Sequence, residues 1–314
     1  MKGYTSPVLR FVGKRLWEGA LTLAALVTLT FFVMRLAPGG PFSRNRKISP
    51  EILAHIKAAF HLDEPIWQQF ARYVWGLAHF DFGPSTRFRD YSVGDLIISG
   101  LPYSLTIGFW AIVVASLVGI ALGILGALRR NSATDYLAGI VGVIGIAVPI
   151  FVIGPLAQVI FALHLNWLPV GGSDQGWRSL VMPVLVLSLP NIAYISRLTR
   201  GSMIEVMREN YVRTARAKGI GPRRTLLVHT LKGALLPVIA YLGPATAGII
   251  TGSILIETIF AVPGIGRHFV DAALNRDYPL VMGITLLYGG LLILFNILTD
   301  LVRGWLDPKV RGHG

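Results

Sequence analysis

Six long stretches without a charged residue divide this chain of 314 residues. They are Gly19–Met34, Leu96–Leu128, Tyr136–Ser173, Ser179–Ser196, Gly233–Ile256 and Tyr278–Thr299. Because a helix needs roughly 20 apolar residues to cross the hydrocarbon of a bilayer, we expect six membrane-spanning helices in an all-α protein. Charged residues make up only 14% of the chain, well below the roughly 25% of a soluble domain. The first stretch is short, and Leu16 and Trp17 lengthen it if Glu18 is paired.

The distribution of Lys and Arg predicts which ends of these helices face the cytoplasm. With the N-terminus inside, the inside segments carry 18 of the 29 Lys and Arg residues; these segments are 1–15, 129–136, 197–232 and 303–314. Inside loops rich in Lys and Arg are typical of membrane proteins. This pattern explains the net charge of +13 better than nucleic-acid binding does, so we expect both termini in the cytoplasm and no nucleic acid.

The spans divide the chain into five parts. They are an inner tail at 1–15, a first membrane helix at 16–36, an outer segment at 37–100, a core at 101–302 and an inner tail at 303–314. The core contains five more membrane helices, with spans two and three at about 101–128 and 137–162, and an inner loop at 197–233. Prolines 149 and 155 predict kinks in span three, and frequent glycines in spans two and three predict close helix contacts.

The outer segment 37–100 is expected to contain amphipathic helices. Ser49-Pro50-Glu51 predicts one helix start, and Asp63-Glu64-Pro65 predicts a second. The residues after Pro65 are rich in Tyr, Trp and Phe, which are typical of membrane–water interfaces. A helical cap lying on the membrane surface is therefore the favoured interpretation. A lid over a ligand site is the alternative.

Several kinds of chemistry are disfavoured because their motifs are absent. The sequence has no phosphate-binding loop, so the chain alone should not bind or hydrolyse ATP. It has no zinc-protease or nucleophile-elbow motif and no cysteine, and we expect no metal, no cofactor and no catalytic residue. The acids nearest the spans, Glu18, Glu257 and Asp300, stand at span ends, which argues against an ion-coupled secondary transporter. A membrane-embedded enzyme would need paired polar residues within the spans.

The inner loop carries the positive signal for function. Glu205–Lys218 can form one helix, which Gly219, Gly221 and Pro222 end, and Arg223–Lys232 can form a second. Small residues in the first helix let a partner approach the backbone, and the basic residues around them suit complementary charges. We therefore predict a docking surface for a soluble partner. A basic loop that adheres to anionic lipid is the alternative.

The same residues resemble a known loop. The run from Arg213 to Gly219, Arg-Thr-Ala-Arg-Ala-Lys-Gly, is followed by His229 and by Leu-Leu-Pro-Val at 235–238. Together these resemble the "EAA" coupling loop of ABC-importer permeases in its peptide-permease form, although Arg213 stands where the general motif has Glu. Further stretches are similar to the B-type permease of bacterial oligopeptide importers; they are 34–39, 78–85, 200–206, 248–253 and 273–278.

The resemblance implies a type I ABC importer permease fold in the bacterial inner membrane, with six transmembrane helices and a cytoplasmic coupling-helix loop. It implies an oligopeptide permease subunit that is not itself an enzyme; the alternative is a permease for dipeptides or another small peptide-like solute. The implied partners are a second related permease, two ATPase subunits that bind the ATP, an extracytoplasmic peptide-binding protein and the peptide. The residues implied to contact the ATPases are Glu209, Arg213, Thr214, Ala215, Arg216, Ala217, Lys218, Gly219, Arg223 and His229.

Overall fold

Five helices are long and apolar enough to cross a membrane. The computed structural model describes residues 7–36, 61–88 and 90–306, and within these ranges the regular structure is helical apart from one β-bridge between Pro84 and Ser92. The five long helices are α1 (Pro7–Leu36), α4 (Val93–Leu128), α7 (Trp177–Val206), α11 (Leu236–Ile259) and α13 (Tyr278–Leu306). All five correspond to stretches that the sequence marks as uncharged and apolar.

The long helices extend past the expected boundaries. α1 begins at Pro7, within the segment expected to be a tail, and α13 continues to Leu306. α4 begins at Val93 rather than near 101 because Ser92 and Asp95 form a capping box. The Ser92 hydroxyl accepts the Asp95 backbone N–H at 3.1 Å, and the Asp95 carboxylate accepts the Ser92 backbone N–H at 3.0 Å. Near the start of α1, Glu18 pairs with Arg15 at 3.1 Å, as its place in an apolar stretch requires.

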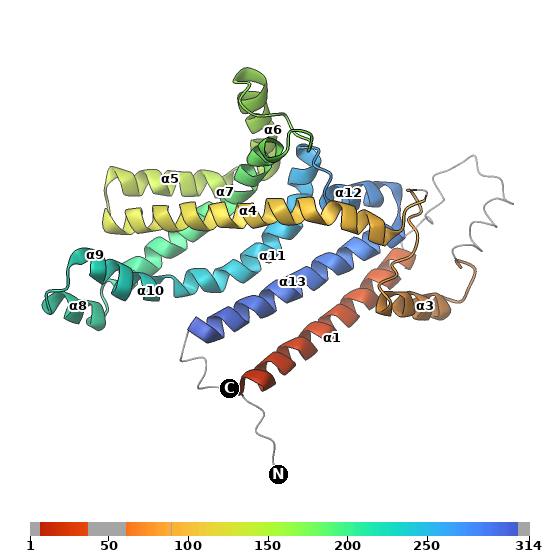
Figure 1. The fold of residues 1–314 in the computed structure, drawn as a ribbon, viewed down its shortest axis with the longest axis horizontal. Coiled ribbons are helices and arrows are strands. Elements are labelled where there is room, and N and C mark those ends of the chain that lie inside the picture. Colours follow the sequence, from red (N-terminus) through yellow and green to blue (C-terminus); the bar gives the residue numbers. More distant parts are fainter. Residues whose placement is uncertain (1–6, 37–60, 89, 307–314) are drawn as a thin grey trace, which may run out of the picture.

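The third expected span, 137–162, is not one continuous helix. It is divided into α5 (Ala133–Ala147), α6 (Ile150–Ala157) and the π-helix η1 (Gln158–His164), and α6 points away from the line of α5 (Figure 1). The break falls at Pro149, whose ψ of 140° is extended. A kink was expected there; the chain turns fully because proline disfavours helix at the residue before it. The Gln158 amide then donates to Val170 O at 2.8 Å and Ile259 O at 3.1 Å.

α4 and α7 form the centre of the molecule, with α5 on one side and α11, α13 and α1 on the other (Figure 1). Glycines on α4 allow the close contact. A Cβ at Gly119 would lie 2.8 Å from Ile195 Cβ, and one at Gly123 would lie 2.5 Å from Thr199 Cβ. This is the close packing of membrane helices through small residues that the glycine frequency predicts.

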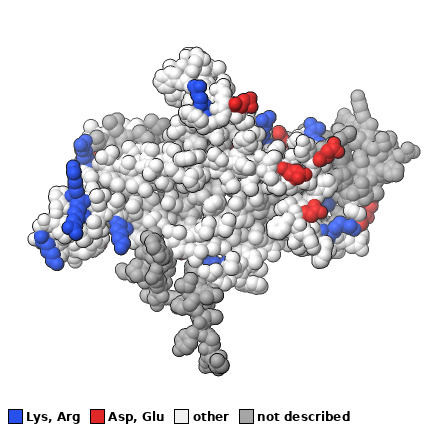
Figure 2. Space-filling view, in the orientation of Figure 1, with Lys and Arg blue, Asp and Glu red and all other residues white. Residues whose placement is uncertain are grey.

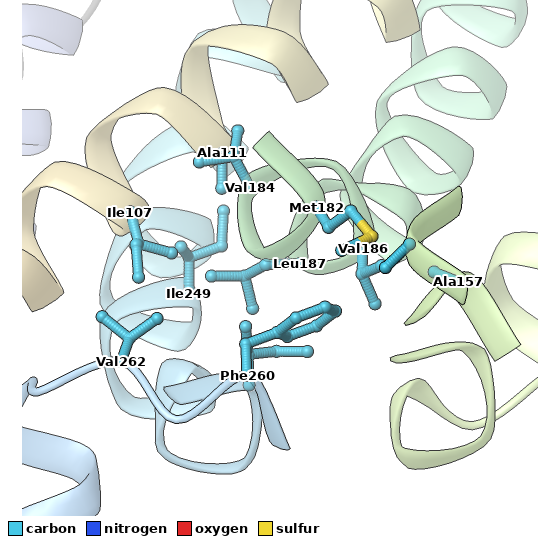
Figure 3. Packing of buried hydrophobic residues seen from close by; sticks show 12 residues of the cluster. Ile107, Ala111, Ala157, Met182, Val184, Val186, Leu187, Ile249, Phe260 and Val262 are labelled. Carbon is cyan, nitrogen blue, oxygen red and sulfur yellow. The ribbon is translucent and has the colours of Figure 1, made fainter. Parts of the chain in front are cut away.

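The largest buried apolar cluster lies where α4, α6, α7 and α11 meet (Figure 3). Ile107 from α4, Leu187 from α7 and Phe260 at the end of α11 are each no more than 2% exposed. The cluster sits toward the same end of the molecule as α12 (Ile265–Asn275), opposite the inner loop (Figure 1). It therefore joins the helices firmly at one end.

The described part of the outer segment packs on the end of α1. Its helix α3 (Ile66–Ala78) begins directly after Pro65, as expected, whereas the helix start expected at Ser49 lies outside the described residues. Phe70 and Tyr73 of α3 contact Phe31 of α1, with ring centroids 5.2 and 5.7 Å apart. Beyond α3, the buried Asp277 at the start of α13 accepts hydrogen bonds from Ser85 and from the backbone of residues 86 and 87.

Candidate functional site

The inner loop leaves α7 through a sharp turn. α7 ends at Val206, and α8 (Asn210–Ala217) begins after Glu209. Backbone bonds close the turn, with Glu209 N donating to Val206 O at 3.1 Å. The single helix expected over Glu205–Lys218 is therefore interrupted. The change of direction lets α8 pack against the following segment, and this tertiary contact outweighs the local preference for one helix.

Gly219 ends α8 in a Schellman motif. Its φ is +75°, its N–H donates to Arg216 O at 3.0 Å, and the N–H of Ile220 donates to Ala215 O at 3.2 Å. This pair of bonds satisfies the last carbonyls of the helix, and the left-handed conformation favours glycine. The helix end expected at Gly219 is thus present. The positive φ at this position explains why glycine stands there.

The second half of the loop leads into the membrane through a π-helix. α9 (Pro222–Arg224) starts with proline at its first position and continues into η2 (Thr225–Thr230) and α10 (Leu231–Ala234), just before α11. Two threonine side chains of η2 donate to carbonyls five residues earlier. Thr225 Oγ1 donates to Ile220 O, before α9, and Thr230 Oγ1 donates to Thr225 O, each at 3.2 Å. His229 lies within η2 and is half-buried.

One face of α8 is buried against the rest of the loop. Val212 is fully buried and Ala215 is 4% exposed. Ala215 therefore packs inside the loop, and the expectation that a partner would approach it directly is revised. A Cβ at Gly233 would lie 2.9 Å from the Tyr211 hydroxyl, so Tyr211 needs glycine there. Tyr211 and Gly233 were not among the expected residues; the i, i+3 spacing of Val212 and Ala215 was the signal for the buried face.

The opposite face of α8 and the α8–α9 turn are exposed and basic. Eight of the residues expected to contact the ATPases are exposed here: Glu209, Arg213, Thr214, Arg216, Ala217, Lys218, Gly219 and Arg223. Figure 2 shows Lys and Arg gathered over this end of the molecule, whereas Asp and Glu gather at the other end. We call these exposed residues, together with Arg224, the basic surface. It offers guanidinium and ammonium groups around a backbone turn, and so suits an acidic protein partner.

The loop is supported from behind by the ends of α4 and α7. Ala127, Met203 and Ala234 are buried together, with Val206 and Leu226 packed against them. A cavity of about 330 Å³ adjoins this cluster, lined by Leu128, Met207, Arg216, Pro222, Arg223, Thr225, Leu226 and Thr230. The loop is thus joined to α4 and α7 by apolar contacts, and it borders the cavity on one side.

An ion pair next to the loop joins α5 to α7. Arg200 Nε lies 2.6 Å from Asp135 Oδ1, and Arg200 Nη2 lies 2.7 Å from Asp135 Oδ2. The Asn131 backbone N–H also donates to Asp135, and these donors hold the pKa of Asp135 at about 2. Asp135 therefore stays charged at neutral pH. The expected site residues did not include this pair, because nothing in the sequence links two positions so far apart.

The arrangement at the loop is suited to binding a partner of opposite charge. Among the residues that the structure describes, no three His, Asp or Glu side chains gather where they could hold a metal ion. The loop presents exposed cations and a turn without a side chain, and it contacts α4 and α7 through apolar residues and continues into α11. A partner that moves this loop would move those helices.

Two family models match the chain. Residues 119–312 match the family described as "Binding-protein-dependent transport system inner membrane component". Residues 8–86 match its N-terminal companion. The two matches cover the inner loop, the α4–α7 contact from Gly119 onward and the outer segment as far as residue 86.

The chain is also similar to known proteins over nearly all its length. It is 49% identical to "Oligopeptide transport system permease protein OppB" of Escherichia coli (strain K12), over 97% of this chain and 100% of that protein. It is 41% identical to "Dipeptide transport system permease protein DppB" of Bacillus subtilis (strain 168), over 97% and 98%. Among solved structures, an inward-facing MetNI methionine ABC transporter matches with a TM-score of 0.55 at 16% identity, covering 68% of this chain and 96% of that one.

Proposed function

The chain belongs to the family of binding-protein-dependent transport system inner membrane components, and on that premise we propose that it is the permease subunit of an ATP-driven oligopeptide importer. Its fold is that of the type I ABC importer permeases, and it is a multi-pass membrane protein. The observation that carries the proposal is the 49% identity to an oligopeptide permease across the whole of that protein. A dipeptide permease is the second candidate, favoured by the 41% identity to DppB.

The coupling proposal rests on the geometry of the loop. In the proposed mechanism, the basic surface binds an ATPase subunit. Motion of α8 is then transmitted through the buried face of α8 to η2 and α10. From there it reaches α11 directly and α4 and α7 through the apolar cluster around Met203. Such a linkage would switch the membrane helices between inward and outward openings as rigid bodies. ATP binding and hydrolysis belong to the partner in this scheme.

The proposed assembly contains this chain, a second related permease, two ATPases and an extracytoplasmic peptide-binding protein. The inner loop faces the cytoplasm together with both termini, in the bacterial inner membrane. The separation of charge along the molecule supports this orientation, because Lys and Arg gather at the α8–α9 end (Figure 2). The binding protein would meet the opposite end, where the outer segment lies.

Transport by the reconstituted complex tests the function. The tagged chain, purified from bacterial membranes, should bring down a second permease and ATPase subunits. In proteoliposomes, that complex with its binding protein should import a labelled peptide of three to five residues only when ATP is supplied on the ATPase side. A matched sample with an ion gradient and no ATP should import none. Import driven by the gradient alone would contradict the proposal, and import of dipeptides alone would favour the second candidate.

Single cysteines should report the orientation. The chain has no cysteine, so Gln68→Cys on α3 and Thr214→Cys on α8 would each be the only thiol. Both side chains are exposed. In intact cells an impermeant maleimide should label Gln68→Cys after the outer membrane is made permeable, and should label Thr214→Cys only after the inner membrane is opened. Labelling of both from the same side would refute the orientation.

A further inference from the structure

A cavity of about 340 Å³ lies at the end of α1, away from the inner loop. The end of α1, the helix α3, the turn after α3 and the start of α13 all line it. This volume is within the range of small-molecule sites. The cavity lies beside α1, whose main helix contact is with α13, so it is separate from the central α4–α7 pair.

Arg35 brings a positive charge to this cavity. Its guanidinium carbon lies 5.4 Å from the centroid of the Phe31 ring, and it also interacts electrostatically with Tyr278, another residue of the cavity wall. Arg72 also lines the cavity, but it is paired with Glu64 at 2.7 Å. Arg35 can still donate to an anion, because a guanidinium carries several N–H donors.

Two further polar groups of the cavity wall have no partner. The hydroxyl oxygen of Tyr73 and the side-chain oxygen of Gln69 are shielded from solvent and make no hydrogen bond within the protein. The Gln69 amide is oriented by its own nitrogen, which donates to Leu62 O at 3.2 Å and to Glu64 O at 2.7 Å. Its oxygen is thus an acceptor. Burial raises the pKa of the Tyr73 hydroxyl, so that group stays protonated and can donate.

The surfaces around the cavity are those of a membrane interface. Val33 and Leu36 on α1 are 61% and 77% exposed, and Trp67 and Trp75 on α3 are each 69% exposed. Trp67 packs on Phe32 of α1, with ring centroids 5.4 Å apart. Exposed tryptophans beside the end of an apolar span are typical of the headgroup level of a bilayer.

We propose that this cavity binds the headgroup of a phospholipid that carries both a phosphate and an N–H donor, as phosphatidylethanolamine does. The phosphate pairs with the Arg35 guanidinium and accepts a hydrogen bond from the Tyr73 hydroxyl. The ammonium group donates a hydrogen bond to the Gln69 side-chain oxygen. The acyl chains lie along the exposed apolar face of α1. In the orientation proposed above this lipid belongs to the outer leaflet.

Thermal unfolding of the full chain in detergent, with added lipid, tests the site. Short-chain phosphatidylethanolamine should raise the unfolding temperature of the wild type. Phosphatidylcholine, which has the phosphate but no N–H donor, should raise it less. Arg35→Gln should weaken the apparent affinity for phosphatidylethanolamine at least about tenfold, because a hydrogen-bonded charge is lost. Arg87→Gln, an exposed arginine outside the cavity, is the matched control and should respond as the wild type does.

The Tyr73→Phe variant separates binding from folding. Without lipid it should unfold at the same or a higher temperature than the wild type, because it removes an unpaired buried hydroxyl. With phosphatidylethanolamine its gain should be smaller than that of the wild type. A purely structural role for Tyr73 would instead lower stability under both conditions.

Other ligands give distinct outcomes. Inorganic phosphate that stabilised the wild type as strongly as phosphatidylethanolamine would replace the lipid proposal with a free-anion site. A tripeptide that stabilised it while phosphatidylethanolamine did not would assign the cavity to a peptide. An equal response of the wild type and Arg35→Gln to phosphatidylethanolamine would overturn the proposal. None of these results depends on transport, so they are independent of the proposed function.

Discussion

Replacing Gly219 with Asp is expected to reduce peptide uptake at least about tenfold while the protein still inserts, which corresponds to about 1.4 kcal/mol of lost coupling. The φ of +75° at this position costs a residue with a side chain roughly 1–2 kcal/mol. A Cβ there would meet no atom within 4 Å, so no packing inside the chain is lost. The side chain would instead stand on the basic surface, where it would block close approach and reduce the positive charge.

Three further variants separate the effects of backbone strain, added charge and burial on peptide uptake. Gly219→Asn tolerates the left-handed conformation better and adds no charge, so it should lose less uptake than Gly219→Asp. Arg223→Ala, on the exposed edge of the basic surface, should cost at most about 1 kcal/mol. Ala215→Asp would bury an unpaired carboxylate inside the loop, so we expect less protein in the membrane rather than a pure docking defect. Uptake and ATPase pull-down at matched membrane levels measure these effects, and normal uptake by Gly219→Asp would remove the docking assignment.

Replacing Glu257 with Ala is expected to destabilise the folded protein by about 1–3 kcal/mol. Glu257 is fully buried at the end of α11. Its carboxylate accepts the Ser253 hydroxyl and the Gly266 backbone N–H, each at 2.7 Å. It therefore joins α11 to the start of α12, and the nearby Ser104 of α4 accepts the Ile265 N–H at 2.9 Å. Alanine would leave the buried Gly266 N–H without its acceptor, while the Ser253 hydroxyl could still donate to Ile250 O. It would also open a hole beside Gly264, where a Cβ would meet the carboxylate.

The thermal unfolding midpoint of the detergent-solubilised protein measures this loss. Glu257→Gln keeps the shape and one acceptor oxygen, so it should fall between the wild type and Glu257→Ala. Asp174→Ala, an exposed acid, is the control and should be neutral. If Glu257→Ala unfolded at the wild-type temperature, the described contacts of Glu257 would not stabilise the fold.

The spans that form continuous long helices in the structure were predictable from the sequence. The uncharged stretches ending at Met34, Leu128, Ser196, Ile256 and Thr299 all lie in the five long helices, because hydrophobic length is a local property. The division of the third span was only partly predictable. Pro149 indicates a disturbance, but whether a helix bends or breaks there depends on neighbours such as Gly145, where a Cβ would lie 2.7 Å from Leu189 O.

In the inner loop, too, local sequence rules predict where helices begin and end but not which side chains are buried. The helix end at Gly219 and the helix start at Pro222 follow from local rules about glycine and proline, and both are present. The direction in which Ala215 points could not be inferred, since it depends on η2 packing beneath α8. The role of Tyr211 depends on Gly233 for the same reason.

The pair of Asp135 and Arg200 also has a consequence for how the chain is made. Arg200 lies near the end of α7, in the segment counted above as inside, and it pairs with Asp135 at the start of α5. Asp135 precedes Arg200 by 65 residues, so the ribosome completes the carboxylate and the whole of α5 before it adds the arginine. The order of synthesis therefore makes the acid before the base that pairs with it, and the two meet when α7 packs against α5.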